Sequence, residues 1–276
     1  MLVTLNEVLP KARREGYAVG LFNTVDLEMA KGVLAAAEEL RAPVIIGTAE
    51  VLLPAASLDD LASFLRPLAE RASVPVVLHF DHGLTEEMTK HAIELGFSSV
   101  MYDCSTLDFE GNVRRAAEMT AYAHAHGCSI EAELGHVGTG DATVPSDTYT
   151  VPEDAVRFCE ATGCDALAIA VGTSHGAYKF KPKLDFDRIE TIRNMIPQPL
   201  VLHGGSGLSD DDFREAIRRG ISKVNIFTDL NCAAAKAAHD AYREGIGLTD
   251  VMPQITEAVK AATVKKMKLF GCAGRA

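Results

Sequence analysis

Residues 199–227, PLVLHGGSGLSDDDFREAIRRGISKVNIF, have the pattern of one strand–helix–strand unit. Two apolar runs, 199–203 and 222–227, flank the amphipathic stretch Ser209–Arg219, whose apolar residues recur at helical spacing. Ser209 and the three aspartates after it place a hydroxyl at the N-cap and carboxylates in the first turn, where the helix dipole favours them. The stretch therefore predicts two strands joined by a crossover helix.

The same alternation extends along the chain. Eight short runs predict strands, at 18–22, 43–47, 75–80, 98–102, 128–133, 165–171, 199–203 and 222–227. Helical spacing between them predicts helices at Leu27–Leu40, Leu58–Arg71, Thr85–Leu95, Val113–His126, Pro152–Thr162, Phe186–Met195 and Ser209–Arg219. Strict β–α alternation implies a parallel sheet, and eight units with nearly continuous apolar strands favour a closed (β/α)8 TIM barrel. No linker or change in composition interrupts residues 1–276, so we expect a single α/β domain.

Composition excludes several classes of function. The 276 residues carry a formal net charge of −11. The chain therefore lacks the excess of basic residues that binds nucleic acid, and it has no polybasic patch for a membrane surface. No apolar run approaches the length of about 20 residues that a membrane span needs. The first 18 residues do not have the pattern of a signal peptide, and the six cysteines form no C-x-x-C pair. We expect a cytoplasmic protein with reduced thiols.

Three histidines follow three predicted strands. His82 and His175 come shortly after the runs at 75–80 and 165–171, and His203 ends the run at 199–203. Because active sites of this barrel lie at the carboxyl ends of the strands, the three imidazoles are expected to converge there. Three neutral imidazoles with one open position make a catalytic zinc site. The remaining histidines are expected to take no part in metal binding or catalysis: His79, His91, His124, His126, His136 and His239.

Carboxylates accompany these histidines. Asp81 precedes His82, and a bend at the end of the strand is needed for both side chains to reach the site. Asp81 is expected to act as a general base or acid, or else to orient a ligand histidine. Glu133 and Asp103 follow other strands, and they either support the metal or form a buried structural ion pair.

Glycine-rich turns predict an anion site. Gly204-Gly205-Ser206-Gly207 directly follows His203, and Gly176 follows His175. Glycines let backbone N–H groups face an anion, and the loops after strands seven and eight often bind phosphate in this barrel. The long loop at 135–152, rich in Gly, Thr, Asp and Pro, is expected to be a mobile lid over the site.

With these residues, the chain resembles the class II, zinc-dependent ketose-bisphosphate aldolases of the fructose/tagatose-bisphosphate type, and most closely their tagatose-like branch. The resemblance runs over nearly the full length. It rests on the motifs Leu21-Phe-Asn23, Ala42-Pro-Val-Ile-Ile, Asp81-His82, Ser99–Ser105, Glu131–Gly135, Ala168–Gly176, Leu200–Leu208, Lys223–Thr228 and Phe270–Ala276.

The resemblance implies a role for each matching position. It makes His82, His175 and His203 the Zn²⁺ ligands and places Glu133 and Asp103 near the metal. It makes Asp81 the residue that moves the proton on the hydroxyl or carbonyl oxygen of the cleaved carbon–carbon bond. It also implies a monovalent cation, Na⁺ or K⁺, near the glycine loops, and a homodimer or homotetramer. The predicted contacts to the dihydroxyacetone-phosphate half of a phosphorylated ketose substrate are Asn23, Gly176, Lys179, Gly204, Gly205, Ser206, Asn225 and Thr228.

Two positions depart from the family. The lid loop carries no glutamate for the last proton transfer, and Asp141 is the nearby candidate for that role. The position where the bisphosphate enzymes tend to place a cation for the distal phosphate is here Asn231. We therefore expect that the substrate is either a fructose or tagatose 1,6-bisphosphate or a ketose 1-phosphate without a second phosphate, with a uronate end as one form of the latter.

Other classes of function are less well supported. A Schiff-base aldolase needs a lysine that faces the barrel mouth, and Lys223 lies at the start of its predicted strand, which is the wrong end. A hydrolase of the amidohydrolase type needs His-x-His after strand one, where Phe22-Asn23-Thr24 stands. A non-catalytic accessory subunit of an aldolase complex remains the alternative from a different class.

Overall fold

A closed parallel barrel forms the centre of the molecule. The computed structural model describes residues 1–138, 148–176 and 182–276. The barrel strands are β2 (Val19–Asn23), β3 (Val44–Ala49), β4 (Val76–Gly83), β5 (Ser99–Tyr102), β6 (Ser129–Leu134), β7 (Ala166–Ile169), β8 (Leu200–Leu202) and β9 (Ile221–Ile226). Each strand pairs in parallel with the next, and the β2–β9 pairing completes the ring. The predicted single-domain (β/α)8 TIM barrel is confirmed.

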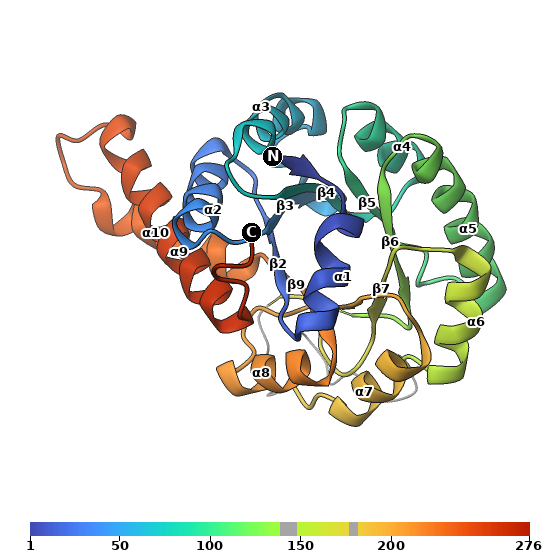
Figure 1. The fold of residues 1–276 in the computed structure, drawn as a ribbon. Coiled ribbons are helices and arrows are strands. Elements are labelled where there is room, and N and C mark those ends of the chain that lie inside the picture. The colour runs from blue at the N-terminus through green and yellow to red at the C-terminus, as the bar shows by residue number, and fades with distance from the viewer. Residues whose placement is uncertain (139–147, 177–181) are drawn as a thin grey trace.

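Helices surround the barrel (Figure 1). They are α2 (Leu27–Leu40), α3 (Leu58–Arg71), α4 (Glu86–Glu94), α5 (Phe109–Ala125), α6 (Pro152–Thr162), α7 (Phe186–Met195) and α8 (Asp210–Arg219). The predicted cap of α8 is present, because the Ser209 hydroxyl accepts a hydrogen bond of 3.2 Å from the N–H of Asp212. Local sequence signals therefore determine where this outer helix begins.

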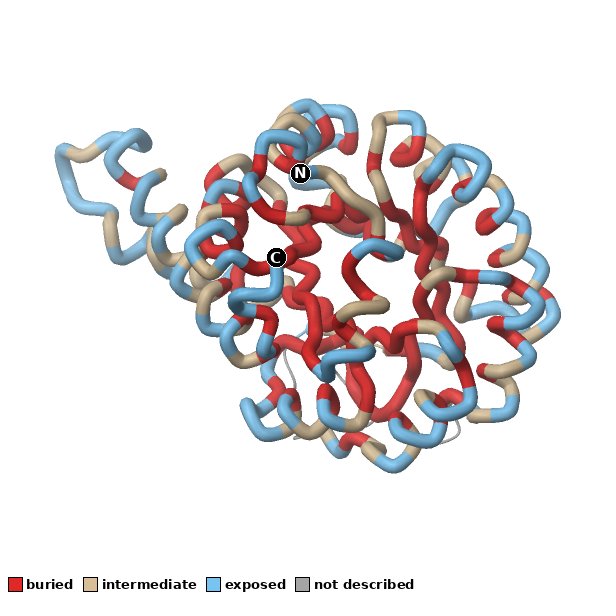
Figure 2. The backbone as a smooth tube through the Cα atoms, viewed as in Figure 1, coloured by how far each residue is buried: buried red, intermediate tan, exposed pale blue. Residues whose placement is uncertain are grey.

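The barrel strands are buried almost without interruption, whereas the helices expose their outer faces (Figure 2). Two strands approach closely at Gly47 of β3, where a Cβ atom would lie 1.8 Å from the carbonyl oxygen of His79 in β4. Only glycine fits at this contact, which brings β3 against the strand that carries Asp81 and His82.

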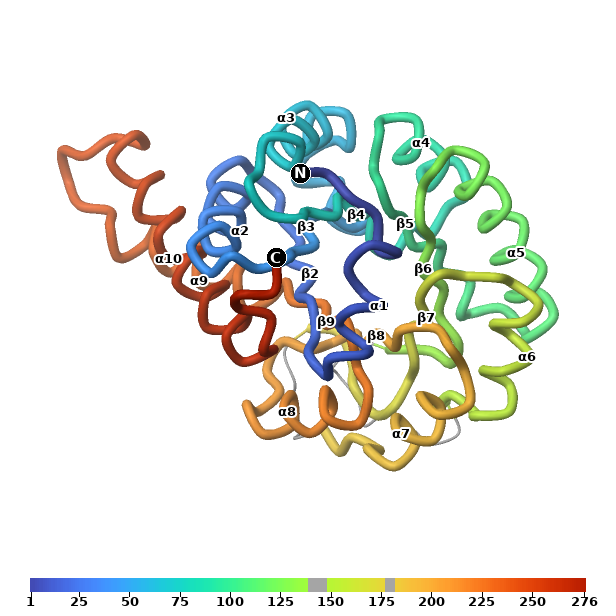
Figure 3. Tube along the Cα trace, viewed as in Figure 1, coloured from blue at the N-terminus to red at the C-terminus, as the bar shows by residue number. Residues whose placement is uncertain are grey.

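Among the described residues, one strand and three α-helices lie outside the predicted alternation. They are β1 (Leu2–Val3), α1 (Leu5–Glu15), α9 (Thr228–Ala241) and α10 (Leu248–Phe270). The N–H of Leu5 donates to the Ser129 hydroxyl at 3.0 Å, and the Asn6 amide donates to Asp165 at 2.9 Å. These partners lie at the amino ends of β6 and β7, so α1 covers that opening and leaves the carboxyl-end opening for a ligand. The turn between α9 and α10 projects away from the barrel (Figure 3).

One predicted strand needs correction, and one predicted loop lies partly outside the described residues. The predicted strand at 165–171 is shorter, because β7 ends at Ile169 and the chain then turns into a loop. Of the predicted lid at 135–152, residues 139–147 lie outside the described part, and α6 already begins at Pro152. Within residues 1–138, 148–176 and 182–276, no helix combines the length and the apolarity that crossing a membrane requires.

Candidate functional site

The three predicted histidines meet at the carboxyl-end mouth of the barrel. His203 directly follows β8, and His82 lies within β4. His175 follows β7 by six residues, in a loop that its own N–H ties to the carbonyl oxygen of Gly138 at 2.8 Å. His82 has a φ of +43°, a left-handed conformation that is uncommon for a residue other than glycine. This is the predicted bend, which lets Asp81 and His82 face the same cavity.

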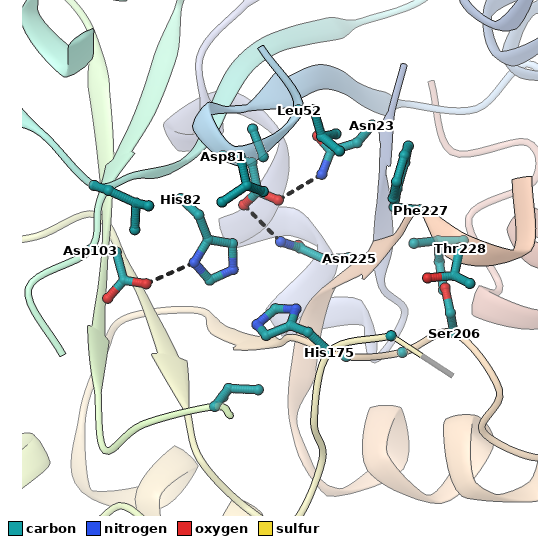
Figure 4. A pocket seen from close by; sticks show the side chains of 18 residues that line it. Asn23, Leu52, Asp81, His82, Asp103, His175, Ser206, Asn225, Phe227 and Thr228 are labelled. Carbon is teal, nitrogen blue, oxygen red and sulfur yellow. Dashed lines mark hydrogen bonds and ion pairs between the residues drawn. The ribbon is translucent and has the colours of Figure 1, made fainter. Parts of the chain in front are cut away.

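The three histidine rings each place a nitrogen close to the other two. Each ring offers a nitrogen within 4.8 Å of the other two. His82 Nε2 and His175 Nε2 are buried without a hydrogen-bond partner among the described residues, and the buried His203 Nδ1 lies 3.1 Å from Glu133 Oε2. Figure 4 shows the rings of His82 and His175 next to each other at the cavity. Buried polar atoms almost always have partners, so two adjacent exceptions beside a third imidazole fit a shared metal ion.

In two of these rings, the second nitrogen forms a hydrogen bond with a carboxylate. His82 Nδ1 lies 2.8 Å from Asp103 Oδ2, and His203 Nε2 lies 2.8 Å from Glu131 Oε1. Such bonds fix the tautomer and the orientation of a ligand histidine. Glu133 Oε2 lies 3.1 Å from His203 Nδ1, and His82, Asp103 and Glu133 form a second, overlapping group that could hold an ion. Asp103 and Glu133 therefore both lie where the sequence placed them, beside the histidines.

The electrostatics of the cluster favour a cation. Burial lowers the pKa of His203, but hydrogen bonds to Glu131 and Glu133 outweigh burial and raise it to about 10. Burial, together with the neighbouring His82 and His203, lowers the pKa of His175 to about 3. Without a metal, the His203 ring is therefore protonated and carries a positive charge between the carboxylates of Glu131 and Glu133. A divalent cation would place its charge in the same field.

Asp81 lies beside this cluster and is held by two amides. The Asn23 amide donates to Asp81 Oδ2 at 2.7 Å, and the Asn225 amide donates to Asp81 Oδ1 at 2.9 Å (Figure 4). Burial raises the pKa of Asp81, but the nearby His82 and Lys223 outweigh burial and hold this pKa below its usual value. Asp81 is thus a carboxylate that can accept a proton. The hydrogen bond that orients His82 goes to Asp103 instead.

A cavity of about 460 Å³ connects the histidines with the predicted anion site. Its walls include Asn23, Asp81, His82, Asp103, His175, Gly176, Gly204, Gly205, Ser206, Asn225 and Thr228. Gly204 has a φ of +64°, and a Cβ atom there would lie 2.3 Å from the carbonyl oxygen of Ser174. Thr228 is the first residue of α9, so a helix N-terminus with its partial positive charge reaches the same wall.

The described lining of this cavity contains no lysine or arginine. Lys179 and Asp141, both predicted to act here, lie outside the described residues. Asn231 is exposed on α9 and is absent from the described cavity wall. Apolar side chains line part of the wall instead, among them Val51, Leu52, Leu84 and Phe227.

Sequence reasoning missed three buried polar residues below the histidines. Lys223, Glu131 and His79 are fully buried, and Lys223 Nζ lies 2.8 Å from Glu131 Oε2. Lys223 was expected at the wrong end of its strand, but it is the third residue of β9 and points into the barrel to Asn225. The available signal was alternation: Glu131 and Glu133, like Lys223 and Asn225, lie two residues apart and share one face of a strand.

Comparison with known proteins agrees with this site. The family model described as class II fructose-bisphosphate aldolase matches residues 3–275. An uncharacterized Escherichia coli K12 protein, YdjI, is 40% identical over 268 residues, which cover 96% of each chain. A fructose-bisphosphate aldolase of Geobacillus stearothermophilus is 40% identical over 283 residues, which cover 100% of this chain and 99% of the relative.

A solved structure extends the similarity to three dimensions. The crystal structure of the YdjI aldolase from Escherichia coli K12 superposes with a TM-score of 0.92 and 38% identity over 100% of both chains. Family model, sequence relatives and structure thus agree over essentially the whole chain, which is therefore a member of the class II fructose-bisphosphate aldolase family and an aldehyde-lyase.

Proposed function

We propose that this chain is a zinc-dependent aldolase that reversibly cleaves a ketose phosphate to dihydroxyacetone phosphate and an aldehyde. The observation that carries the proposal is the set of three converging imidazoles of His82, His175 and His203 beside Asp81. Three neutral imidazoles with an open position are a donor set of catalytic zinc. When bound, zinc supplies Lewis-acid stabilisation of the negative charge that the three-carbon fragment acquires.

Asp81 performs the proton transfer at the aldehyde half. During cleavage it takes the proton of the C4 hydroxyl, the C3–C4 bond breaks, and its electrons stay with the three-carbon fragment. During condensation Asp81 returns that proton. The amides of Asn23 and Asn225 keep the carboxylate in place throughout. A second acid then protonates the three-carbon fragment, and Asp141 is our candidate for it.

The substrate phosphate binds at the glycine-rich wall. We assign it to Gly176, Gly204, Gly205, Ser206 and Thr228, where glycine backbone and the start of α9 offer N–H donors. Lys179 is proposed as a further phosphate partner. A monovalent cation, Na⁺ or K⁺, is proposed beside the same loops.

The substrate is proposed to be a ketose 1-phosphate. Support comes from Asn231, where a bisphosphate enzyme would place a cation, and from the described cavity wall, which offers no lysine or arginine. Losing a charged partner for a phosphate weakens that contact by about 1.5–3 kcal/mol. The alternative is a 1,6-bisphosphate, which is favoured by the similarity to relatives named fructose-bisphosphate aldolase.

Steady-state kinetics tests this choice. The values of kcat/KM would be compared for fructose and tagatose 1-phosphates and for the corresponding 1,6-bisphosphates. We expect higher values for a 1-phosphate, and a strong preference for a bisphosphate would refute this part of the proposal. Zinc-loaded protein that releases no dihydroxyacetone phosphate from any of the four would favour the accessory-subunit alternative.

Two further expectations stay proposals. The six cysteines are free in the structure, and five of them are buried, which is consistent with a cytoplasmic protein. A homodimer or homotetramer is proposed from family resemblance alone, and sedimentation equilibrium would measure the assembly.

A further inference from the structure

A continuous set of polar contacts runs through the barrel interior beneath the cavity. Lys223 Nζ lies 2.8 Å from Glu131 Oε2 and donates to Asn225 Oδ1 at 2.8 Å. Asn225 in turn donates to Asp81 Oδ1, and Glu131 contacts His203. One ammonium group therefore connects the residue proposed as the base with a histidine proposed as a metal ligand.

Lys223 determines which end of the Asn225 amide faces Asp81. The ammonium can only donate, so the oxygen of the amide must point toward Lys223 and its NH₂ toward the carboxylate. A flipped amide would place its oxygen against Asp81 and an NH₂ against the ammonium. Asn23 lacks such a constraint, because its Oδ1 is buried without a hydrogen-bond partner among the described residues. Of the two amides on Asp81, the one from Asn225 has its orientation fixed by a third residue.

Lys223 itself is remote from substrate. It is 0% exposed and is not among the residues that line the cavity. Its ammonium is engaged by Glu131 and Asn225, so it is not placed to attack a carbonyl group. His79, also buried, lies 3.9 Å from Asp81 Oδ1 on the same side and bonds to Ser99 at 2.7 Å. The contacts of Lys223 are thus those of a group that orders other side chains.

We propose that Lys223 is a positioning residue for the aldol reaction, which fixes the Asn225 amide and through it holds the Asp81 carboxylate in the orientation that accepts the C4 hydroxyl proton. This inference rests on the proposed function, since it takes Asp81 as the base. Displacing a reacting group by about 1 Å can cost on the order of 10²-fold in rate. Loss of the Lys223 contact should therefore appear in kcat more than in KM.

The test is a mutant cycle with Lys223→Met and Asn225→Ala, singly and together, on zinc-loaded full-length protein. If Lys223 acts through Asn225, K223M lowers kcat by about 10- to 100-fold in the wild-type background but by less than about 2-fold when N225A is already present. Zinc content is measured for each variant. Lys260→Met is the matched control, because Lys260 also forms a 2.7 Å ion pair, with Glu39, but on the outer helices. We expect K260M to leave kcat unchanged.

Unpaired Glu131 could prevent K223M from folding, because breaking a buried ion pair is strongly destabilising. In that case the charge-neutral pair E131Q/K223M replaces the single lysine substitution, and its effect on kcat is measured with Asn225 (wild type against E131Q/K223M) and without it (N225A against E131Q/K223M/N225A). Equal losses of kcat from the lysine substitution with and without Asn225 would overturn the proposal, since they would show a general structural effect.

A crystal structure of the lysine variant gives a second readout that does not depend on activity. We expect the Asp81 carboxylate to move and its contact with Asn225 to be lost. An unmoved Asp81 that keeps this contact would overturn the inference. If the wild-type protein cleaves no ketose phosphate, the proposed function fails, and the crystal structure alone decides whether Lys223 positions Asp81.

Discussion

Replacing Asp103 by alanine should weaken zinc binding without removing a histidine. Asp103 Oδ2 lies 2.8 Å from His82 Nδ1, and its other oxygen accepts from both the hydroxyl and the N–H of Ser105, at 2.7 and 3.0 Å. The carboxylate is therefore held in advance in the position that orients the His82 ring. Loss of such a partner typically costs about 10- to 100-fold in metal affinity, which corresponds to about 1.4–2.8 kcal/mol.

Competition with a chromophoric zinc chelator measures the effect directly. The zinc Kd of D103A is expected to rise by about 10- to 100-fold over that of the wild type. Asp59→Ala is a matched control, because Asp59 forms a similar contact of 2.9 Å with His91 on the surface. D59A should bind zinc as the wild type does. A D103A protein with unchanged zinc affinity, or a D59A protein with an equal loss, would refute the reasoning.

Three further predictions address the base, the substrate and the pH dependence. Asp81→Asn should lower kcat by about 10²- to 10⁴-fold while zinc content stays unchanged; metal analysis and kinetics check both, and near-normal turnover would exclude Asp81 as the base. Asn231→Arg should raise kcat/KM for 1,6-bisphosphates relative to 1-phosphates by about 10-fold, and an unchanged ratio would show that position 231 does not face the distal phosphate. Burial lowers the pKa of His79 to about 3, so the unfolded chain binds a proton below about pH 6.5 that the folded state does not take up until about pH 3. The melting temperature of metal-free protein should therefore fall between pH 6.5 and pH 3, and less steeply in His79→Gln; parallel melting curves for the two proteins would contradict this assignment.

The fold was predictable because its signals are local. The stretches Leu27–Leu40 and Pro152–Thr162 are helices with the predicted bounds, since the apolar spacing lies within each segment and local signals mark its start, the Asp26 cap in one and a proline in the first turn in the other. The role of α1 was not predictable in this way. Its contacts to Ser129 and Asp165 depend on the closed barrel, which brings residues more than 120 positions apart into contact.

The candidate site was predictable to the extent that it lies at strand ends. His82, His203 and Asp81 follow directly from that rule, and the left-handed His82 supplies the bend that it requires. The interior contacts of Lys223 and Glu131 could not be read from apolar patterning, because they are charged residues buried on the inner face of the barrel. The closed barrel brings the two charges together, because β6 and β9 place Glu131 and Lys223 2.8 Å apart across its interior.

Release of dihydroxyacetone phosphate before and after removal of the metal tests the central claim most directly. Purified protein would be assayed with a ketose 1-phosphate and with a ketose 1,6-bisphosphate, then treated with a chelator, desalted and assayed again with and without added Zn²⁺. The account predicts release that disappears with the metal and returns with zinc. Equal release from protein shown by metal analysis to be zinc-free would contradict it.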